Sequence, residues 1–127
     1  MTQIIKLKTL TSTNDYAEQL LAKGEVEEGT VIWAEEQTAG KGQGANTWES
    51  EPGKNLTFSL ILHPHFIHPS LQFMISKAVS LGVLEYAKTV LPGISCGLKW
   101  PNDICAGEKK LGGILIRHMI SGERIVS

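Results

Sequence analysis

The stretch NLTFSLIL at residues 55–62 alternates between apolar and polar side chains over most of its length. Such a period of two predicts a β-strand, because successive side chains of a strand point to opposite faces. One face would carry four large apolar side chains and the other two hydroxyls: Leu56, Phe58, Leu60 and Leu62 against Thr57 and Ser59. This is the clearest strand in the sequence, and the elements on either side of it indicate the fold class.

Toward the N-terminus, residues 35–54 carry six charges, four glycines and one proline, with almost no apolar content. We expect a loop of about twenty residues there, and long loops in compact domains are usually functional or disordered. Residues 30–34 before it form a candidate buried strand. Further upstream, residues 11–15 are rich in N-cap residues and predict a helix of about ten residues that ends at Gly24. Residues 3–7 form a first short strand.

Toward the C-terminus, Ser70 is placed to cap the longest helix, which ends at Pro92-Gly93. Its apolar band is wide, which predicts that it is covered on most sides. Three further strands are expected, at residues 94–100, 111–116 and 125–126. Turns are expected between them, at residues 106–109 and 121–123. The order of strands and helices favours an α+β sheet with helices on one face over a repeated βαβ arrangement.

The composition predicts a globular protein of one domain, since 42% of the 127 residues are hydrophobic and 20% are charged. Twelve basic against thirteen acidic residues give a net charge of −1, without the basic excess typical of nucleic-acid binding. No apolar run is long enough for a membrane span or a signal peptide, so a cytoplasmic location is expected. The two cysteines fit neither a disulfide framework nor a zinc pattern. The chain stops within the expected last strand, which suggests a domain incomplete at its C-terminal end.

Three clusters could carry chemistry, and the first lies in the long loop as Gly40-Lys41-Gly42-Gln43-Gly44. Glycines allow backbone N–H groups to approach an anion closely, and Lys41 adds a positive charge. The run is not a Walker loop, and residues 46–53 do not open a helix as a dinucleotide-binding motif requires. The alternative is a flexible surface loop.

The second cluster is Lys99-Trp100-Pro101-Asn102-Asp103. A lysine at a strand end, facing away from Leu98, suits the stabilisation of an oxyanion or phosphate, and Asp103 could hold that lysine or a metal. The alternative is a turn with a surface salt bridge.

The third cluster contains two adjacent glycines, Gly112 and Gly113, inside an expected strand. Glycine there allows close approach of a ligand or backbone, or it marks a bulge. The spaced histidines His63, His65 and His68 are better explained as a solvated connection than as metal ligands.

Taken together, five motifs resemble the biotin protein ligases in order and spacing along nearly the whole chain: STN at 12–14, QTAGKG at 37–42, Trp48, KWPND at 99–103 and KLGGIL at 110–115. The resemblance implies the α+β fold shared with class II aminoacyl-tRNA synthetases and lipoate ligases, a mixed, largely antiparallel sheet backed by helices. It also implies that residues 1–127 are a biotin/lipoate ligase-type catalytic domain.

The activity implied by this resemblance is ATP- and Mg²⁺-dependent attachment of biotin, through biotinyl-5′-AMP, to a lysine of a biotin carboxyl carrier domain. A carboxylate nucleophile needs no base, so catalysis would consist of positioning and neutralisation of phosphate charge. The expected partners are that carrier domain and a second copy in a homodimer. Nucleic acid and membrane are not expected as partners, since no helix-turn-helix precedes the domain.

The resemblance also assigns roles to individual residues. Lys99 and Lys41 would be catalytic. Biotin would be bound by Ser12, Thr13, Asn14, Gln37, Gly40, Lys41, Gly42, Gln43 and Lys99. ATP and the adenylate would be bound by Trp48, Asn102, Asp103, Lys110 and Gly113, and Asp103 would also contact the metal.

Four positions depart from the usual pattern of these ligases: Lys41 and Gln43 where arginine is common, Ala45 in place of glycine, and Arg117 where many relatives have glutamate. Lysine cannot clamp an anion bidentately as arginine does, so weaker binding is expected. Two alternatives to a complete ligase are a truncated fragment that binds biotin without turnover, and lipoate or octanoate transfer on the same fold.

Overall fold

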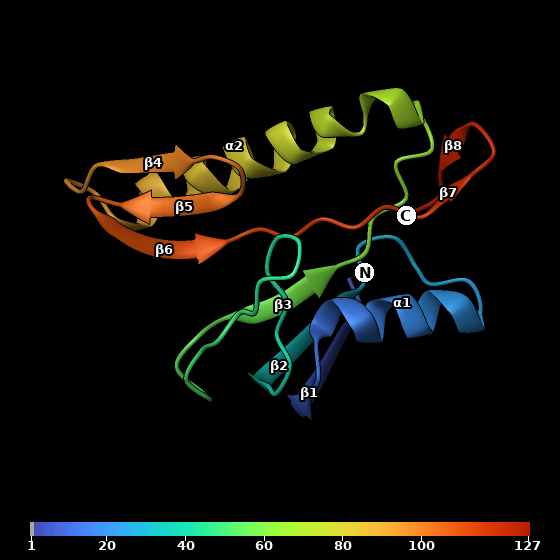
Figure 1. The fold of residues 1–127 in the computed structure, drawn as a ribbon, viewed down its shortest axis with the longest axis horizontal. Helices are drawn as coiled ribbons and strands as arrows, with labels where there is room; N and C mark the ends of the chain where they lie inside the picture. Colours follow the sequence, from blue (N-terminus) through green and yellow to red (C-terminus); the bar gives the residue numbers. More distant parts are fainter. Residues whose placement is uncertain (1) are drawn as a thin grey trace. The chain divides into compact units, whose positions relative to one another are not determined.

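The computed structural model describes residues 2–127, which fold as two compact units. The first unit ends at Pro64 and includes Ser127, and the second spans His65–Val126. Each unit combines helix with a three-stranded sheet (Figure 1). Antiparallel strand pairs predominate and one pair is parallel, so the expected α+β class with a mixed, largely antiparallel sheet is confirmed.

The sheet of the first unit has the order β1-β2-β3, formed by Ile4–Leu10, Val31–Gln37 and Thr57–Leu60. β1 and β2 are parallel and are joined through helix α1, Thr13–Lys23, whereas β3 runs antiparallel to β2. The expected boundary of the long loop is wrong by three residues. β2 continues to Gln37 because β1 extends to Leu10 and pairs with it there.

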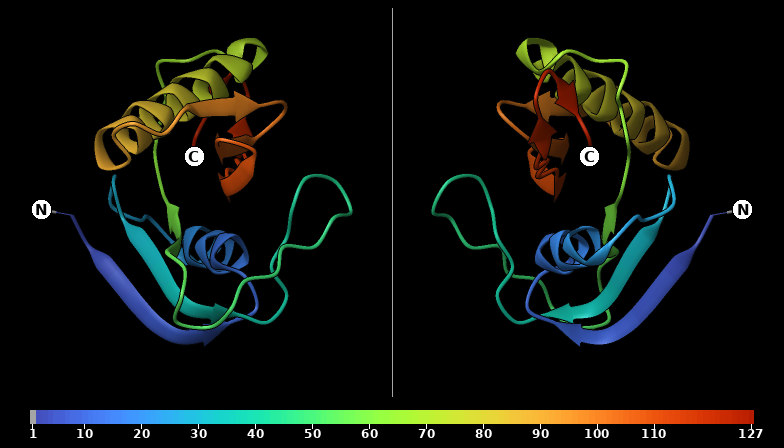
Figure 2. Two further views of the ribbon diagram at one scale, coloured as in Figure 1. Left: turned by 90° about the vertical axis from the view of Figure 1, so that its left-hand side faces the viewer. Right: turned by 90° about the vertical axis from the view of Figure 1, so that its right-hand side faces the viewer.

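Helix α1 begins where the cap-rich sequence predicts. The Ser12 side chain accepts a hydrogen bond from the Asp15 N–H at 3.4 Å, and the helix ends before Gly24. Its buried Ala17 packs with Ile32 and Ile61 to form the small core of this unit, so α1 covers one face of the sheet (Figure 2).

The face of β3 that α1 covers is the one that carries the hydroxyls. Ser59 is 8% exposed, whereas Phe58 and Leu60 are about half exposed. On β2, Trp33 pairs with Phe58. The Lys6 ammonium lies 4.2 Å from the centroid of the Trp33 ring. The alternation of residues 55–62 therefore predicts the strand correctly, but in this strand the polar face is the buried one.

The second unit begins with a 3-10 turn, Pro69–Leu71, followed by helix α2, Phe73–Val90. The predicted cap at Ser70 is wrong. The His68 side chain caps the turn and accepts from the Ser70 N–H at 3.2 Å, and α2 begins three residues after Ser70.

Helix α2 packs on an antiparallel sheet with the order β4-β5-β6, formed by Cys96–Lys99, Asp103–Ala106 and Lys109–Gly113. The predicted turn between β5 and β6 is confirmed, with Gly107 at φ +60°, a conformation that favours glycine. The strand expected at 111–116 instead ends at Gly113, and a short hairpin, β7 Ile120–Ser121 and β8 Arg124–Ile125, follows.

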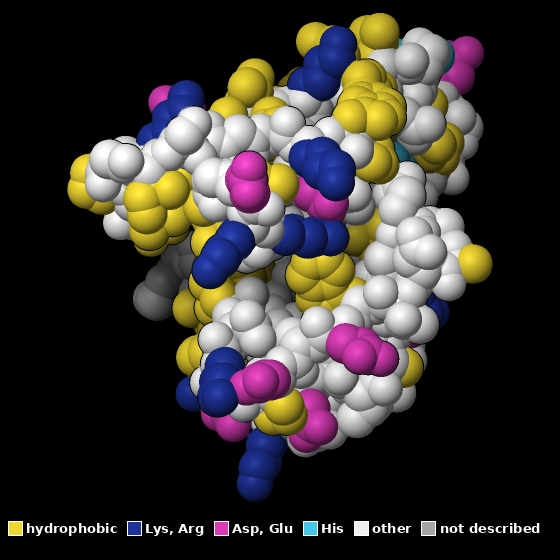
Figure 3. Space-filling view, turned by 60° about the vertical axis from the view of Figure 1, so that its left-hand side comes forward, with side chains coloured by type: hydrophobic (Ala, Val, Ile, Leu, Met, Phe, Trp, Pro, Cys, Tyr) yellow, Lys and Arg dark blue, Asp and Glu magenta, His cyan; other side chains and the backbone are white. Residues whose placement is uncertain are grey.

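Helix α2 is less covered than its apolar band predicts. Only Ala87 of the helix is fully buried, and several large apolar side chains are more than half exposed, among them Met74, Leu81, Tyr86 and Val90. Apolar side chains are visible on the surface in the space-filling view (Figure 3). Within residues 2–127, no helix has the length and hydropathy needed to cross a membrane.

Candidate functional site

In the first unit, the start of α1, the end of β2 and the middle of β3 bring hydroxyl and amide groups together. The Gln37 side-chain oxygen accepts from the backbone N–H of Thr13 at 2.8 Å and lies 3.1 Å from its hydroxyl. Ser12 and Thr13 are almost fully buried. Because these groups are neutral, the cluster suits a polar but uncharged part of a ligand.

The cluster also contains Ser59, a residue that the sequence analysis did not place in the site. Its hydroxyl lies 2.8 Å from the Thr13 hydroxyl and 2.5 Å from the Asn14 side-chain oxygen. The only sequence signal for it was its place among the hydroxyls of an alternating strand.

The glycine-containing segment after β2, drawn as a loop in Figure 2, folds back on itself as a hairpin through one isolated antiparallel bridge. The Trp48 N–H donates to the Gly40 carbonyl at 2.8 Å, the Gly42 N–H donates to the Asn46 carbonyl at 2.8 Å, and Lys41 pairs with Thr47. Gly40 is buried where this hairpin begins. Gln43 lies exposed at the turn, so the hairpin joins only some of the predicted residues to the cluster.

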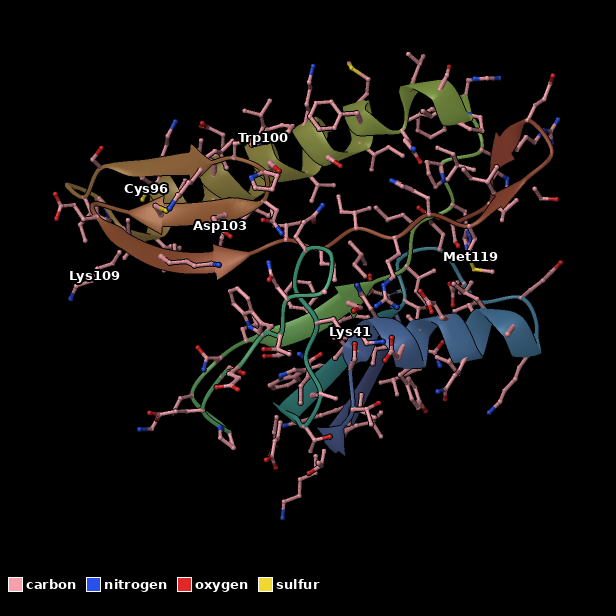
Figure 4. All side chains as sticks on the ribbon, viewed as in Figure 1. Lys41, Cys96, Trp100, Asp103, Lys109 and Met119 are labelled. Atoms are coloured by element: carbon pink, nitrogen blue, oxygen red, sulfur yellow. The ribbon has the colours of Figure 1, made fainter. Side chains whose placement is uncertain are left out.

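Lys41 reaches back to the first turn of α1. Its ammonium lies 3.0 Å from a carboxylate oxygen of Asp15, the residue that follows Asn14 (Figure 4). The Lys41 side chain is 49% exposed, so the ion pair is a weak anchor and a ligand anion can compete for the lysine. A positive charge therefore stands beside the neutral cluster.

In the second unit, the turn at residues 100–102 joins β4 to β5 and places Lys99 opposite Asp103. Opposed residues of an antiparallel pair share a face of the sheet. The Lys110 ammonium lies 2.9 Å from an Asp103 carboxylate oxygen, and Gly113 also pairs with Asp103 (Figure 4). Four predicted residues thus gather here. The ion pair of Asp103 is made with Lys110, on β6.

Two lysines and one carboxylate give this face a net positive charge, which suits an anion such as a phosphate. The remaining predicted residue, Asn102, is partly buried in the turn, and its carbonyl accepts from the Ile114 N–H at 2.9 Å. The backbone between Trp100 and Pro101 is cis.

The donor set does not form a resident metal site. Among residues 2–127 no group of three or more histidine, cysteine or acidic side chains could hold a metal ion. Asp103 offers one carboxylate, which Lys110 already contacts. Magnesium bound to a nucleotide commonly takes most of its ligands from phosphates and water, with one or two carboxylates, so Asp103 could serve only such an ion.

The spaced histidines have other roles. A His63 ring nitrogen lies 2.8 Å from the Val26 carbonyl, and His68 caps the turn before α2.

The first unit thus carries a neutral hydrogen-bonding cluster beside a lysine-bearing glycine hairpin, and the second unit carries a positively charged sheet face. The model of the biotin/lipoate A/B protein ligase family matches residues 7–126. The chain belongs to that family.

Individual relatives are biotin ligases. The chain is 37% identical over 121 residues to the bifunctional ligase/repressor BirA of Bacillus subtilis, covering 93% of this chain and 35% of that protein. A biotin protein ligase from Aquifex aeolicus, solved with biotin and ATP, matches with a TM-score of 0.71 and 32% identity, over 98% of this chain and 49% of that one. The Leishmania major ligase, solved with biotinyl-5-AMP, gives a TM-score of 0.65 and 28% identity, over 98% and 54%. The chain thus spans about a third to a half of the length of these relatives.

Proposed function

We propose that this chain is the biotin-binding portion of a biotin protein ligase, which joins biotin to ATP and passes the biotinyl group to a lysine of a biotin carboxyl carrier domain. One observation carries the proposal: the neutral Thr13–Gln37–Ser59 cluster lies next to the Lys41–Asp15 pair. Biotin has the matching chemistry, a neutral urea ring that donates and accepts hydrogen bonds and a carboxylate at the end of its chain.

In the first step, a biotin carboxylate oxygen would attack the α-phosphorus of ATP, and the bond from that phosphorus to the bridging oxygen would break to release pyrophosphate. In the second, the carrier lysine would attack the acyl carbon, the bond to AMP would break, and the amine would lose a proton. The carboxylate nucleophile of the first step needs no base, so the contributions of the protein to that step are positioning and charge neutralisation. In the second step the carrier lysine would attack as the neutral amine, and the proton that it loses would pass to water.

The residue roles that we propose are those that the family resemblance implies. Ser12, Thr13, Asn14 and Gln37 would bind the urea ring, and the hairpin of Gly40, Lys41, Gly42 and Gln43 would border the carboxylate chain. On the second unit, Lys99 and Lys110 would neutralise phosphate oxygens, with Asp103, Asn102 and Gly113 beside them. The resemblance assigns contact with the adenine to Trp48. Mg²⁺ would arrive bound to ATP and neutralise its phosphates. Four further points stay predictions. The protein would act in the cytoplasm, its partner would be the carrier domain, it would form a homodimer, and it would not bind nucleic acid.

Lipoate transfer is favoured only by the shared family. Lipoate has a carboxylate chain but no urea, so the amide and hydroxyl groups of the cluster would lose their ligand partners, and such losses strongly disfavour an analogue. Free lipoate should therefore not displace biotin in a competition titration.

The test combines calorimetry with mass spectrometry on the purified chain. Titration with biotin should show saturable binding, and addition of Mg-ATP should produce a biotinyl-adenylate peak. Binding without the adenylate would identify a biotin-binding fragment with an unfinished nucleotide pocket. The absence of any biotin binding by the folded chain would overturn the proposal.

A further inference from the structure

Ser59 is the one member of the hydroxyl and amide cluster that comes from β3. It is buried, and it contacts two residues at the start of α1 that lie 45 and 46 positions earlier in the sequence. The same face of the strand carries Ile61, which packs against Ala17 and Ile32. A hydroxyl in such surroundings is costly unless it forms hydrogen bonds, so its partners explain its presence.

The hydrogen bonds fix which way each side chain faces. A carbonyl oxygen can only accept, so the Asn14 oxygen takes a hydrogen bond from the Ser59 hydroxyl. This uses the one proton of Ser59, so in the 2.8 Å contact with Thr13 the Thr13 hydroxyl donates to the Ser59 oxygen, and the Gln37 oxygen is held by the Thr13 backbone N–H at 2.8 Å. Both amide oxygens are therefore turned toward the interior of the cluster.

The Gln37 side chain connects the cluster to the hairpin. Its oxygen faces Thr13, and its nitrogen lies beside Gly40, where an added Cβ would come within 3.0 Å of it. A change at Ser59 would therefore loosen Asn14 directly and Gln37 through Thr13.

We propose that Ser59 is a positioning residue of the biotin site, which acts through Asn14 and Thr13 to hold their side chains, and that of Gln37, in the orientation that receives the ligand. The inference rests on the proposed function. Pre-organised side chains lower the cost of ordering a site on binding, so loss of Ser59 should weaken the affinity for biotin.

The experiment compares Ser59→Ala with the wild-type chain and with Thr57→Val, a matched control two residues earlier in β3. Thr57→Val also removes a hydroxyl, but no hydrogen bond of Thr57 to the cluster is seen among residues 2–127. Two quantities are measured: the Kd for biotin by calorimetry, and the side-chain amide signals of Asn14 and Gln37 by nuclear magnetic resonance in the absence of ligand.

We expect Ser59→Ala to raise the Kd about tenfold, as loss of a buried hydrogen-bond donor does, and to shift both amide signals. Thr57→Val should leave the Kd within about twofold and the two signals in place. An unchanged Kd in folded Ser59→Ala protein overturns the inference, whatever the amide signals do. A raised Kd with unmoved signals overturns it too, because the effect would not pass through Asn14 and Gln37.

The wild-type titration separates this inference from the proposed function. Saturable biotin binding by the wild-type chain supports the function, and the comparison with Ser59→Ala then decides the role of Ser59. If the folded wild-type chain does not bind biotin, the proposed function fails, and the positioning role fails with it.

Discussion

Gly40 is the residue with the least room for a side chain. A Cβ added there would lie 2.3 Å from the Trp48 carbonyl oxygen, a backbone atom that cannot move without its chain. The same two residues are joined by the hydrogen bond from the Trp48 N–H to the Gly40 carbonyl. The absence of a side chain is therefore what lets the hairpin close beside Gln37.

Gly40→Ala should accordingly displace the hairpin. We expect the Kd for biotin to rise by at least about tenfold, because the backbone must shift at a point where it is buried and hydrogen-bonded. Calorimetry measures the loss, with thermal unfolding as the check on folding. The matched control is Gly24→Ala, where a Cβ meets nothing within 4 Å. Equal Kd values for the two variants would contradict the importance of this contact.

Lys99 is the residue on which the chemistry is expected to depend most. Lys99→Ala should lower adenylate formation about 100-fold or more, since a group that stabilises developing negative charge is usually worth that much. The rate of biotinyl-adenylate production by mass spectrometry is the measurement. Lys109→Ala, which removes another exposed lysine of the same sheet, should change it little. Near-wild-type rates for a folded Lys99→Ala protein would remove Lys99 from the mechanism.

At the scale of elements, helix α2 is weakened by one residue. Gly82 lies in its interior and is exposed, and a Cβ added there would meet nothing within 4 Å. Glycine costs a helix conformational entropy that alanine does not, and here no contact compensates for it.

Gly82→Ala should therefore raise the free energy of unfolding by about 0.5–1 kcal/mol. Ala78→Gly, at another exposed position of α2, should lower it by a similar amount. Urea unfolding followed by circular dichroism measures both. Destabilisation by Gly82→Ala would show that the glycine is needed for a contact or a conformation not seen in this helix.

An element could be predicted where the residues that determine it are close together in the sequence. The helix start within residues 11–15 and the turn at residues 106–109 are encoded within a few residues and were predicted correctly. A strand within residues 55–62 was also predicted, although β3 covers only Thr57–Leu60. The end of β2 and the cap before α2 were not predicted correctly. The first depends on the register with β1. The second depends on the 3-10 turn that His68 caps, because this turn contains Ser70 and α2 begins only at Phe73.

At the scale of the whole molecule, the border between the two compact units lies at residues 64 and 65. Phe66, just beyond it, is 88% exposed and lies between β3 and the turn at Pro69–Leu71. Exposed segments outside regular structure are the usual sites of proteolysis.

Brief chymotrypsin treatment should therefore cut first after Phe66, giving fragments that end at Phe66 and begin at Ile67 in the mass spectrum. Trp100 is also exposed, but Pro101 follows it and protects that bond, and Tyr86 lies within a helix. Phe66→Ala should slow the first cut several-fold. A first cut elsewhere in both proteins would mean that this border is not the most accessible part of the chain.

The sequence alone predicted both helices and most of the strands in order, because caps, turns and periodicity act over a few residues, but it missed β5, β7 and the 3-10 turn. It also singled out the residues that we propose for ligand binding. Only the tertiary structure decided which of these side chains contact one another. Thr13 meets Gln37 24 residues later and Ser59 46 residues later, and Lys41 pairs with Asp15 across 26. It also decided that β3 buries Ser59 and exposes Phe58. Local patterns cannot specify this, because which face of a strand is buried depends on the element that packs against it and on whether its polar groups find partners there.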